Sequence, residues 1–174
     1  YTLIRGRYLT GGLLGKGASG CCYRAYDTVL EVETVIKEFV PLADFSAGIQ
    51  EQKTLFLQEA GFFFGKYEYP GFSAVTDVFE EKGRVYLAGE YYGGGNLRDY
   101  LKKQSQGRIT VEKALELLAP VFEALSYLHS TGMVHGGISM ERLVFDEDGG
   151  LHLTGCGSCF LRKKEKDYGP WRDV

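Results

Sequence analysis

The segment MVHGGISMERLVFDEDGGLHLTGCG, residues 133–157, decides the fold. It follows a long amphipathic stretch and contains two short β-type runs, Leu143 to Phe145 and Leu151 to Thr154, which the turn-rich sequence DEDGG joins. A His-Gly-Gly loop precedes these runs and a Gly-Cys-Gly loop follows them. The pattern therefore predicts a β-hairpin that comes directly after a helix and lies between two glycine-rich loops.

Composition narrows the classes of protein that fit this sequence. The net charge is −3, and the one basic run, RKKEK at 162–166, is interrupted by Glu, which argues against a nucleic-acid-binding surface. No apolar run approaches the roughly 18 residues of a membrane-spanning helix, and no secretory signal is recognisable. The four cysteines then favour a reducing compartment, so we expect a cytoplasmic protein unless segments outside this sequence tether it.

A glycine-rich loop, GKGASG at residues 15–20, lies between the apolar runs Tyr8 to Leu14 and Cys21 to Tyr26. Strands on both sides predict a hairpin that could cover a phosphate, whereas a dinucleotide fingerprint needs a helix after the last glycine. Taken alone, the pattern G-x-G-x-x-G also fits an ordinary glycine-rich turn, which is the commoner case.

The next predicted strand, Glu33 to Phe39, carries Lys37 among apolar residues. A half-buried ammonium is costly unless it meets a phosphate or a carboxylate. A helix is predicted from Ser46 onward, and Glu59 within it is a candidate partner for Lys37; an exposed helix glutamate is the alternative. The apolar face of this helix is expected to contain Ile49, Leu55, Phe56, Ala60, Phe63 and Phe64.

Two further strands, Ser73 to Glu80 and Arg84 to Glu90, complete a predicted five-stranded antiparallel sheet. The glycine-rich link Glu90 to Gly95 is the expected hinge between a unit of residues 1–90 and a mainly helical unit of residues 91–174. In the second unit, Asn96 should cap a short helix from Leu97 to about Lys103.

A long helix is predicted from Thr110, its N-cap, up to Gly132. Apolar residues recur along it at helical spacing, namely Leu115, Leu118, Phe122, Leu125 and Leu128. This helix would be the spine of the second unit.

Together, these features resemble the protein kinase family, and phrases such as VIKEF and ITVEKALELLAPVFEALSYLH resemble bacterial-type Ser/Thr kinases in particular. The resemblance runs from about Tyr8 to Gly157. It implies a bilobal α+β fold, with a small lobe made of the sheet and one helix and a mainly helical large lobe. Residues 169–174, GPWRDV, resemble the start of a further helix, so the large lobe is expected to be incomplete.

The resemblance also places the family's catalytic motifs, H-R-D-x-x-x-x-N and D-F-G, on this sequence. The His, Arg, Asp and Asn of the first correspond to His135, Gly136, Gly137 and Arg142, and the Asp, Phe and Gly of the second to Gly155, Cys156 and Gly157. It therefore implies that the catalytic base and the magnesium ligands are absent, so that no catalytic set is intact.

For the nucleotide, the resemblance implies contacts from Gly15, Gly17, Gly20, Cys22, Val35, Lys37, Glu59, Gly89, Glu90 and Val144. Val35 replaces a smaller alanine and should crowd the adenine, at about 1–3 kcal/mol, whereas Gly89 at the gatekeeper position should open space. Arg142 could contact a phosphate in place of magnesium; an ordinary ion pair or a solvent-facing side chain is the alternative. ATP, if it binds, is expected to bind weakly and without magnesium.

Three functions follow from these residues. The first is a pseudokinase, a regulatory module for a protein partner such as a kinase or signalling protein, and the second is a residual ATP-dependent Ser/Thr transferase. The third is a thiol or zinc module of Cys156 and Cys159 with Cys21 and Cys22. Adjacent strand residues point to opposite faces, so Cys21 and Cys22 cannot easily share one metal, and we expect incidental thiols and no metal site.

Overall fold

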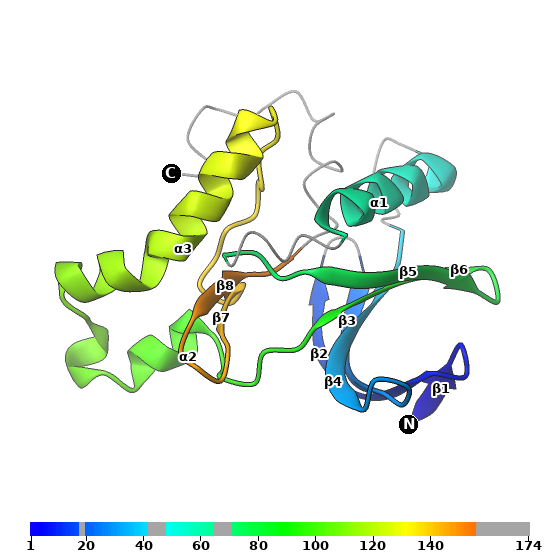
Figure 1. The fold of residues 1–174 in the computed structure, drawn as a ribbon, viewed down its shortest axis with the longest axis horizontal. Helices are drawn as coiled ribbons and strands as arrows, with labels where there is room; N and C mark the ends of the chain where they lie inside the picture. Colours follow the sequence, from blue (N-terminus) through cyan, green and yellow to red (C-terminus); the bar gives the residue numbers. More distant parts are fainter. Residues whose placement is uncertain (18–19, 42–47, 65–70, 156–174) are drawn as a thin grey trace. The chain divides into compact units, whose positions relative to one another are not determined.

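The computed structural model describes residues 1–17, 20–41, 48–64 and 71–155 (Figure 1). The described chain forms two compact units. The N-terminal unit comprises the described residues within 1–64 together with 74–91, and the C-terminal unit comprises residues 71–73 and 92–155. The predicted Cys156, Cys159 and the final segment 169–174 lie outside the described residues.

The N-terminal unit is built on an antiparallel sheet with the strand order β1-β2-β3-β4-β6-β5. The strands are β1 (Thr2–Ile4), β2 (Tyr8–Gly17), β3 (Gly20–Asp27), β4 (Val32–Phe39), β5 (Val75–Glu81) and β6 (Arg84–Glu90). All five expected strands are present, and β1 extends the sheet at one edge. With three residues, β1 is too short to show the alternation by which a strand is recognised in a sequence.

Aromatic stacking closes the curl of this sheet. The ring of Tyr8 on β2 stacks on Phe79 of β5 with centroids 5.3 Å apart, and Phe79 stacks on Tyr86 of β6 at 5.4 Å. Two strands that are far apart in the strand order therefore meet through their side chains. The buried cluster on this inner face is Ile4, Tyr8, Ala25, Ile36, Phe79, Tyr86 and Ala88.

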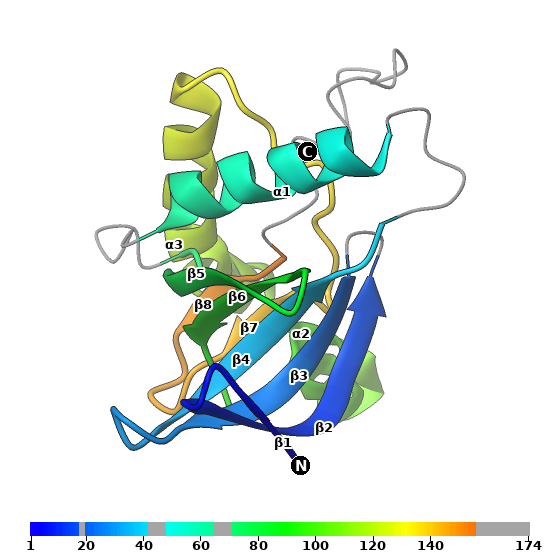
Figure 2. The ribbon, with the colours of Figure 1, turned by 90° about the vertical axis from the view of Figure 1, so that its right-hand side faces the viewer.

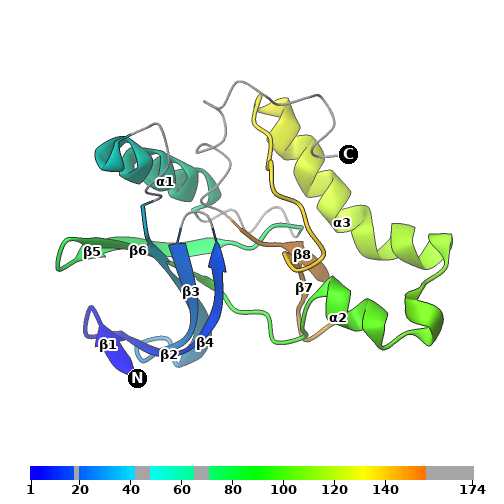
Figure 3. The same cartoon turned by 180° about the vertical axis from the view of Figure 1, so that it is seen from behind.

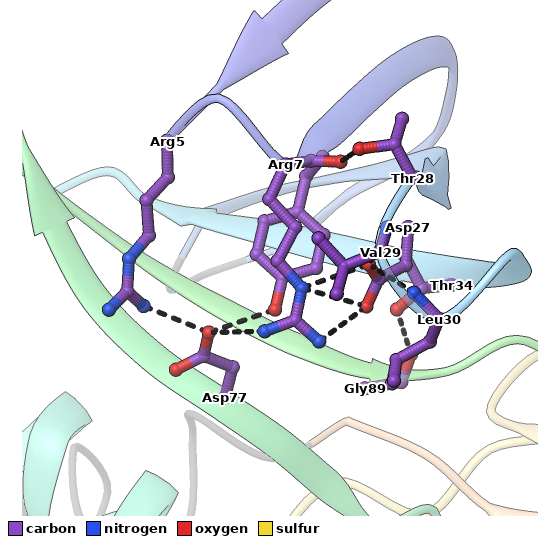
Figure 4. Close-up of polar contacts among 10 residues, drawn as sticks. Arg5, Arg7, Asp27, Thr28, Val29, Leu30, Thr34, Asp77 and Gly89 are labelled. Carbon is purple, nitrogen blue, oxygen red and sulfur yellow. Dashed lines mark hydrogen bonds and ion pairs between the residues drawn. The ribbon is translucent and has the colours of Figure 1, made fainter.

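A charged network joins the turn between β1 and β2 to Asp27 of β3 and Asp77 of β5 (Figure 4). The Arg7 guanidinium donates to both carboxylate oxygens of Asp27, which is only 3% exposed, and the shortest of these contacts is 2.6 Å. Asp77 accepts from Arg5 at 2.9 Å and from the Tyr8 hydroxyl at 2.8 Å. The hydrogen bond from Arg7 lowers the pKa of Asp27, and burial raises the pKa of Tyr8.

Helix α1 (Ile49–Phe63) lies beside β5 (Figure 2). Its buried face is formed by Gln52, Phe56, Ala60 and Phe63. The prediction was wrong at both ends of this face, because Ile49 is 65% exposed and Phe64 is 53% exposed. Ile49 belongs to a first turn that extends beyond the core, and Phe64 has extended backbone after the helix ends.

The C-terminal unit consists of α2 (Leu97–Lys102), a 3₁₀ turn (Ser105–Gly107), α3 (Val111–Ser130) and the hairpin β7 (Leu143–Phe145) and β8 (Leu151–Leu153). The predicted caps are confirmed, since Asn96 Oδ1 accepts from the Asp99 N–H at 2.9 Å and Thr110 Oγ1 from the Lys113 N–H at 3.2 Å. α3 lies beside β8 and α2 beside β7 (Figure 3).

The predicted apolar stripe of α3 divides between two faces. Leu125 and Leu128 are buried, whereas Leu115 is 57% exposed and Phe122 is 51% exposed, so the prediction was wrong for these two side chains. The periodicity could not separate the faces because apolar residues occur on both. Among the described residues, no helix is long and apolar enough to cross a membrane.

Two glycines allow close approach of backbones around the hairpin. A Cβ at Gly94 would lie 2.6 Å from the Phe145 carbonyl oxygen, to which the Gly94 N–H donates at 2.9 Å. A Cβ at Gly71 would lie 2.0 Å from the Pro120 carbonyl oxygen, and the Gly71 carbonyl accepts from the Leu153 N–H at 2.8 Å. Backbone hydrogen bonds to neighbouring segments therefore fasten both strands of the hairpin.

Candidate functional site

The glycine-rich loop has strands on both sides, as its sequence predicts. Gly15 pairs with Cys22, and Gly17 pairs with Gly20. Gly20 has a φ of +151°, and a Cβ there would lie 1.9 Å from the Glu38 carbonyl oxygen, so no side chain fits without moving the backbone. Nothing lies within 4 Å of a Cβ at Gly15. Gly20 is therefore required by the sheet itself, whereas Gly15 leaves open space in the loop.

The strand register places four predicted nucleotide contacts on one face of the sheet. Cys22 pairs with Lys37 and Val35 pairs with Gly89. Directly opposed residues share a face, and so do residues two apart in one strand. We call this face, defined by Cys22, Val35, Lys37 and Gly89, the nucleotide face.

Lys37 is half-buried, and its ammonium lies 5.4 Å from the centroid of the Phe56 ring on α1. A cation over an aromatic face is attracted by the ring quadrupole, whose face is electrically negative. Glu59 follows Phe56 by three residues in the same helix, and its side chain lies outside the described part of the structure. The side chain of Lys37 thus points toward α1, and its pairing with Glu59 stays a prediction.

The backbone of a neighbouring segment lies close to Gly89, the residue at the gatekeeper position. A Cβ at Gly89 would lie 2.9 Å from the Ala74 carbonyl oxygen. That carbonyl accepts from the Glu90 N–H at 3.3 Å, and the Glu90 carboxylate accepts from the Ala74 N–H at 3.3 Å. The Thr34 hydroxyl also donates to the Gly89 carbonyl at 2.7 Å (Figure 4). The room left by the missing side chain is therefore partly filled by Ala74.

In the C-terminal unit, both the backbone and the guanidinium of Arg142 form hydrogen bonds. Its N–H donates to the Ser139 carbonyl at 3.0 Å, and its carbonyl accepts from Thr154 twice, from the N–H at 2.7 Å and from the hydroxyl at 3.1 Å. The guanidinium Nη1 donates to the Gly137 carbonyl at 3.0 Å. Arg142 thus links the His-Gly-Gly loop to the residues that follow β8.

The side chain of Arg142 also fills the space beside Gly155. A Cβ at Gly155 would lie 3.1 Å from Arg142 Cδ, 3.2 Å from Nη1 and 3.3 Å from Nε, and Gly155 has a φ of +114°. The Arg142 guanidinium donates a hydrogen bond to a backbone carbonyl of the loop, and its predicted contact with a phosphate stays a prediction. A cation therefore lies where the resemblance would place a metal-binding carboxylate.

The remaining predicted positions of the C-terminal unit lie in the loop before β7 and in the hairpin. His135 is 1% exposed, and Gly136 has a φ of +64°, a conformation that favours glycine. Val144 is half-buried and pairs with His152 in the hairpin. Within the described residues, no group of three His, Cys, Asp or Glu side chains is arranged to hold a metal ion.

The sequence did not identify the residues that position Arg142. Ser139, at an unspecified position of the first motif, acts through its carbonyl, and Thr154, which belongs to neither motif, acts through its N–H and its hydroxyl. The sequence does place a polar residue, Thr154, between β8 and Gly155, where its side chain can form a hydrogen bond with the segment before β7. A signal of this kind does not indicate which carbonyl the hydroxyl reaches.

A family model described as the protein kinase domain matches residues 8–169. The chain belongs to the protein kinase domain family. It is 32% identical over 143 residues to a serine/threonine-protein kinase B from Synechocystis, 29% over 172 residues to a CBL-interacting protein kinase 22 from rice and 28% over 152 residues to a 3-phosphoinositide-dependent protein kinase 1 from Arabidopsis thaliana. These alignments cover 81%, 89% and 85% of this chain.

The predicted family and the bilobal α+β fold class are confirmed. The kinase domain chain spans 25%, 37% and 29% of the length of the three relatives. Protein kinase domains use ATP as the phosphate donor and position it mainly by electrostatic contacts.

Proposed function

We propose that this kinase domain is a pseudokinase, which does not transfer phosphate and instead binds or regulates a protein partner such as another kinase. The observation that carries the proposal is the placement of Arg142, whose guanidinium contacts Gly137 and fills the space beside Gly155. At these three positions, the family resemblance calls for a base and two magnesium ligands. Glycine at 137 and 155 offers no side-chain oxygen, and Arg142 offers a positive charge.

The loss of metal ligands weighs more than the loss of the base. Removing a general base costs on the order of 10²- to 10⁴-fold in rate, which would leave a slow enzyme. A hard cation such as Mg²⁺ needs oxygen ligands, and a guanidinium at about the same place repels it. Without a metal, the charge that develops on the transferred phosphoryl group lacks its main counter-charge.

Retained features support weak nucleotide binding that does not depend on magnesium. The loop keeps its glycines, and Lys37 projects from the nucleotide face toward α1. Arg142 is already positioned by backbone contacts, so it could meet a phosphate without first becoming ordered. Val35 acts in the opposite direction, since it crowds the adenine.

The test is a phosphotransfer assay with Mg-ATP, with the domain itself and a generic protein as substrates. We expect no incorporation above a no-enzyme control for the wild type or for Lys37→Met. Magnesium-dependent incorporation that Lys37→Met abolishes would show that the chain is an active kinase. Folding of the variant is checked by its thermal melting curve.

A residual ATP-dependent transferase is the second candidate, favoured by the retained loop and Lys37. Thermal shift with ATP distinguishes it from the first. A stabilisation that EDTA leaves unchanged supports binding through Arg142, whereas a stabilisation that requires magnesium supports the transferase. No shift under any condition removes the transferase.

A further inference from the structure

Arg24 on β3 makes contacts that lead across the sheet. Its Nε donates to Oε1 of Glu33 at 2.8 Å, and its Nη2 forms an ion pair with the same oxygen. The guanidinium carbon also lies 5.0 Å from the centroid of the Tyr91 ring. One guanidinium therefore joins a residue of β4 to the residue that directly follows β6.

The register shows what this side chain crosses. Arg24 pairs with Val35, and Val35 pairs with Gly89, in the strand order β3-β4-β6. Arg24 is two residues from Cys22, so it lies on the nucleotide face. A side chain that begins on β3 and reaches Tyr91 beyond the end of β6 must pass over β4, beside Val35.

We propose that Arg24, Glu33 and Tyr91 form a strap over the end of the nucleotide face that contains Val35 and Gly89. This strap lowers the affinity of the domain for adenine nucleosides and nucleotides. The inference rests on the proposed function in one respect, since it takes the nucleotide face as the surface that an adenine would contact. The strap acts on the base, whereas Arg142 and Lys37 concern the phosphates. It therefore makes Arg24 a specificity-determining residue of the site.

The contacts of the strap suit a gate that can open. Arg24 and Glu33 have side chains 52% and 46% exposed, and an exposed ion pair or a single exposed cation–π contact is weak. The strap should therefore open in a minor fraction of molecules. The apparent affinity for a base is reduced by that fraction, and removing the strap removes the reduction.

The experiment measures adenosine binding by calorimetry for the wild type and for Arg24→Ala. Adenosine has no phosphates, so Lys37 and Arg142 do not contribute to the difference. We expect Arg24→Ala to bind adenosine about three- to tenfold more tightly, from the opening of two weak contacts. Glu33→Gln keeps the cation–π contact and should give a smaller gain.

Arg84→Ala is the matched control. Arg84 on β6 forms an ion pair with Glu38 at 2.7 Å in the same sheet, and its side chain is 65% exposed. We expect this variant to lose a similar small amount of thermal stability and to leave adenosine affinity unchanged. A structural role for Arg24 would change the melting temperature alone, and only a strap changes adenosine affinity.

The outcomes separate the two proposals. Equal or weaker adenosine binding by Arg24→Ala, including no measurable binding, overturns the strap and leaves the absence of phosphotransfer as it stands. Phosphotransfer by the wild type overturns the pseudokinase proposal and leaves the adenosine comparison valid. A gain in Arg84→Ala equal to that in Arg24→Ala also overturns the strap, because the effect would then belong to the sheet as a whole.

Discussion

The two units differ in how closely their site positions match the motifs of the protein kinase family. The N-terminal unit keeps the glycine-rich loop and the lysine that the family resemblance calls for, whereas the loops of the C-terminal unit carry Gly137, Arg142 and Gly155. Hydrogen bonds to the backbone nevertheless hold positions in both units, namely the strand pairs at Cys22 and Val35 in the first unit and the two bonds from Thr154 to the Arg142 carbonyl in the second. The difference teaches that buried apolar residues and backbone hydrogen bonds hold this hairpin and its loops with glycine at positions 137 and 155.

The largest expected effect comes from two glycines, one in each unit, that allow backbones to approach closely. Gly20→Ala in the N-terminal unit and Gly71→Ala in the C-terminal unit place a Cβ 1.9 and 2.0 Å from backbone oxygens, respectively. We expect each to lower the free energy of unfolding by about 2–4 kcal/mol, since the backbone must shift. Urea denaturation measures the change. Gly12→Ala, with nothing within 4 Å, is the control and should cost far less.

The next effect concerns the buried carboxylate of the N-terminal unit. Asp27→Asn weakens the contact with Arg7 and should cost about 2–3 kcal/mol at pH 7, because the pair is partly desolvated. The folded pKa of Asp27 is lowered, so its stabilisation is present above the unfolded pKa of about 3.9 and is lost as the pH falls through the folded value. Unfolding curves of both proteins from pH 7 to pH 2.5 should therefore converge at the acid end. A constant difference would contradict this assignment.

A third prediction restores carboxylate chemistry to the C-terminal unit. Gly155→Asp alone should gain no magnesium affinity, because Arg142 would pair with the new carboxylate and the backbone conformation is strained. Arg142→Asn together with Gly155→Asp should bind Mg²⁺ about tenfold more tightly than either single variant, since two oxygen ligands then replace the cation. Calorimetric titration with MgCl₂ measures this coupling. Additive single effects would show that Arg142 does not control the position.

The smallest effect compares helix caps within the C-terminal unit. Asn96→Ala and Thr110→Ala each remove an acceptor for a backbone N–H, at a cost of about 0.5–2 kcal/mol. Chemical denaturation gives the change. Ser126→Ala, an exposed substitution within α3, should cause no loss. An equal loss of stability in all three variants would contradict the assignment of the first two losses to the helix caps.

Much of the fold was predictable because its signals are local. The caps at Asn96 and Thr110, the loop between β2 and β3 and the β7–β8 hairpin all follow from residues close together in the chain. Phe64 is exposed because the helix ends before it, whereas the errors at Ile49, Leu115 and Phe122 share one cause. A periodic pattern identifies an apolar side chain, but the packing of other elements decides whether that side chain is buried.

The sequence by itself determined the order of the elements, the kinase domain family and the presence of glycine at positions 137 and 155, where the family resemblance calls for acidic residues. Only the tertiary structure decided that Arg142 fills the space beside Gly155, that Ala74 approaches Gly89 and that Arg24 crosses β4 to Tyr91. The physical reason is the range of each interaction. Turns, caps and strand patterns depend on neighbours along the chain, whereas the direction of a long arginine side chain depends on carbonyls and rings brought near it by folding.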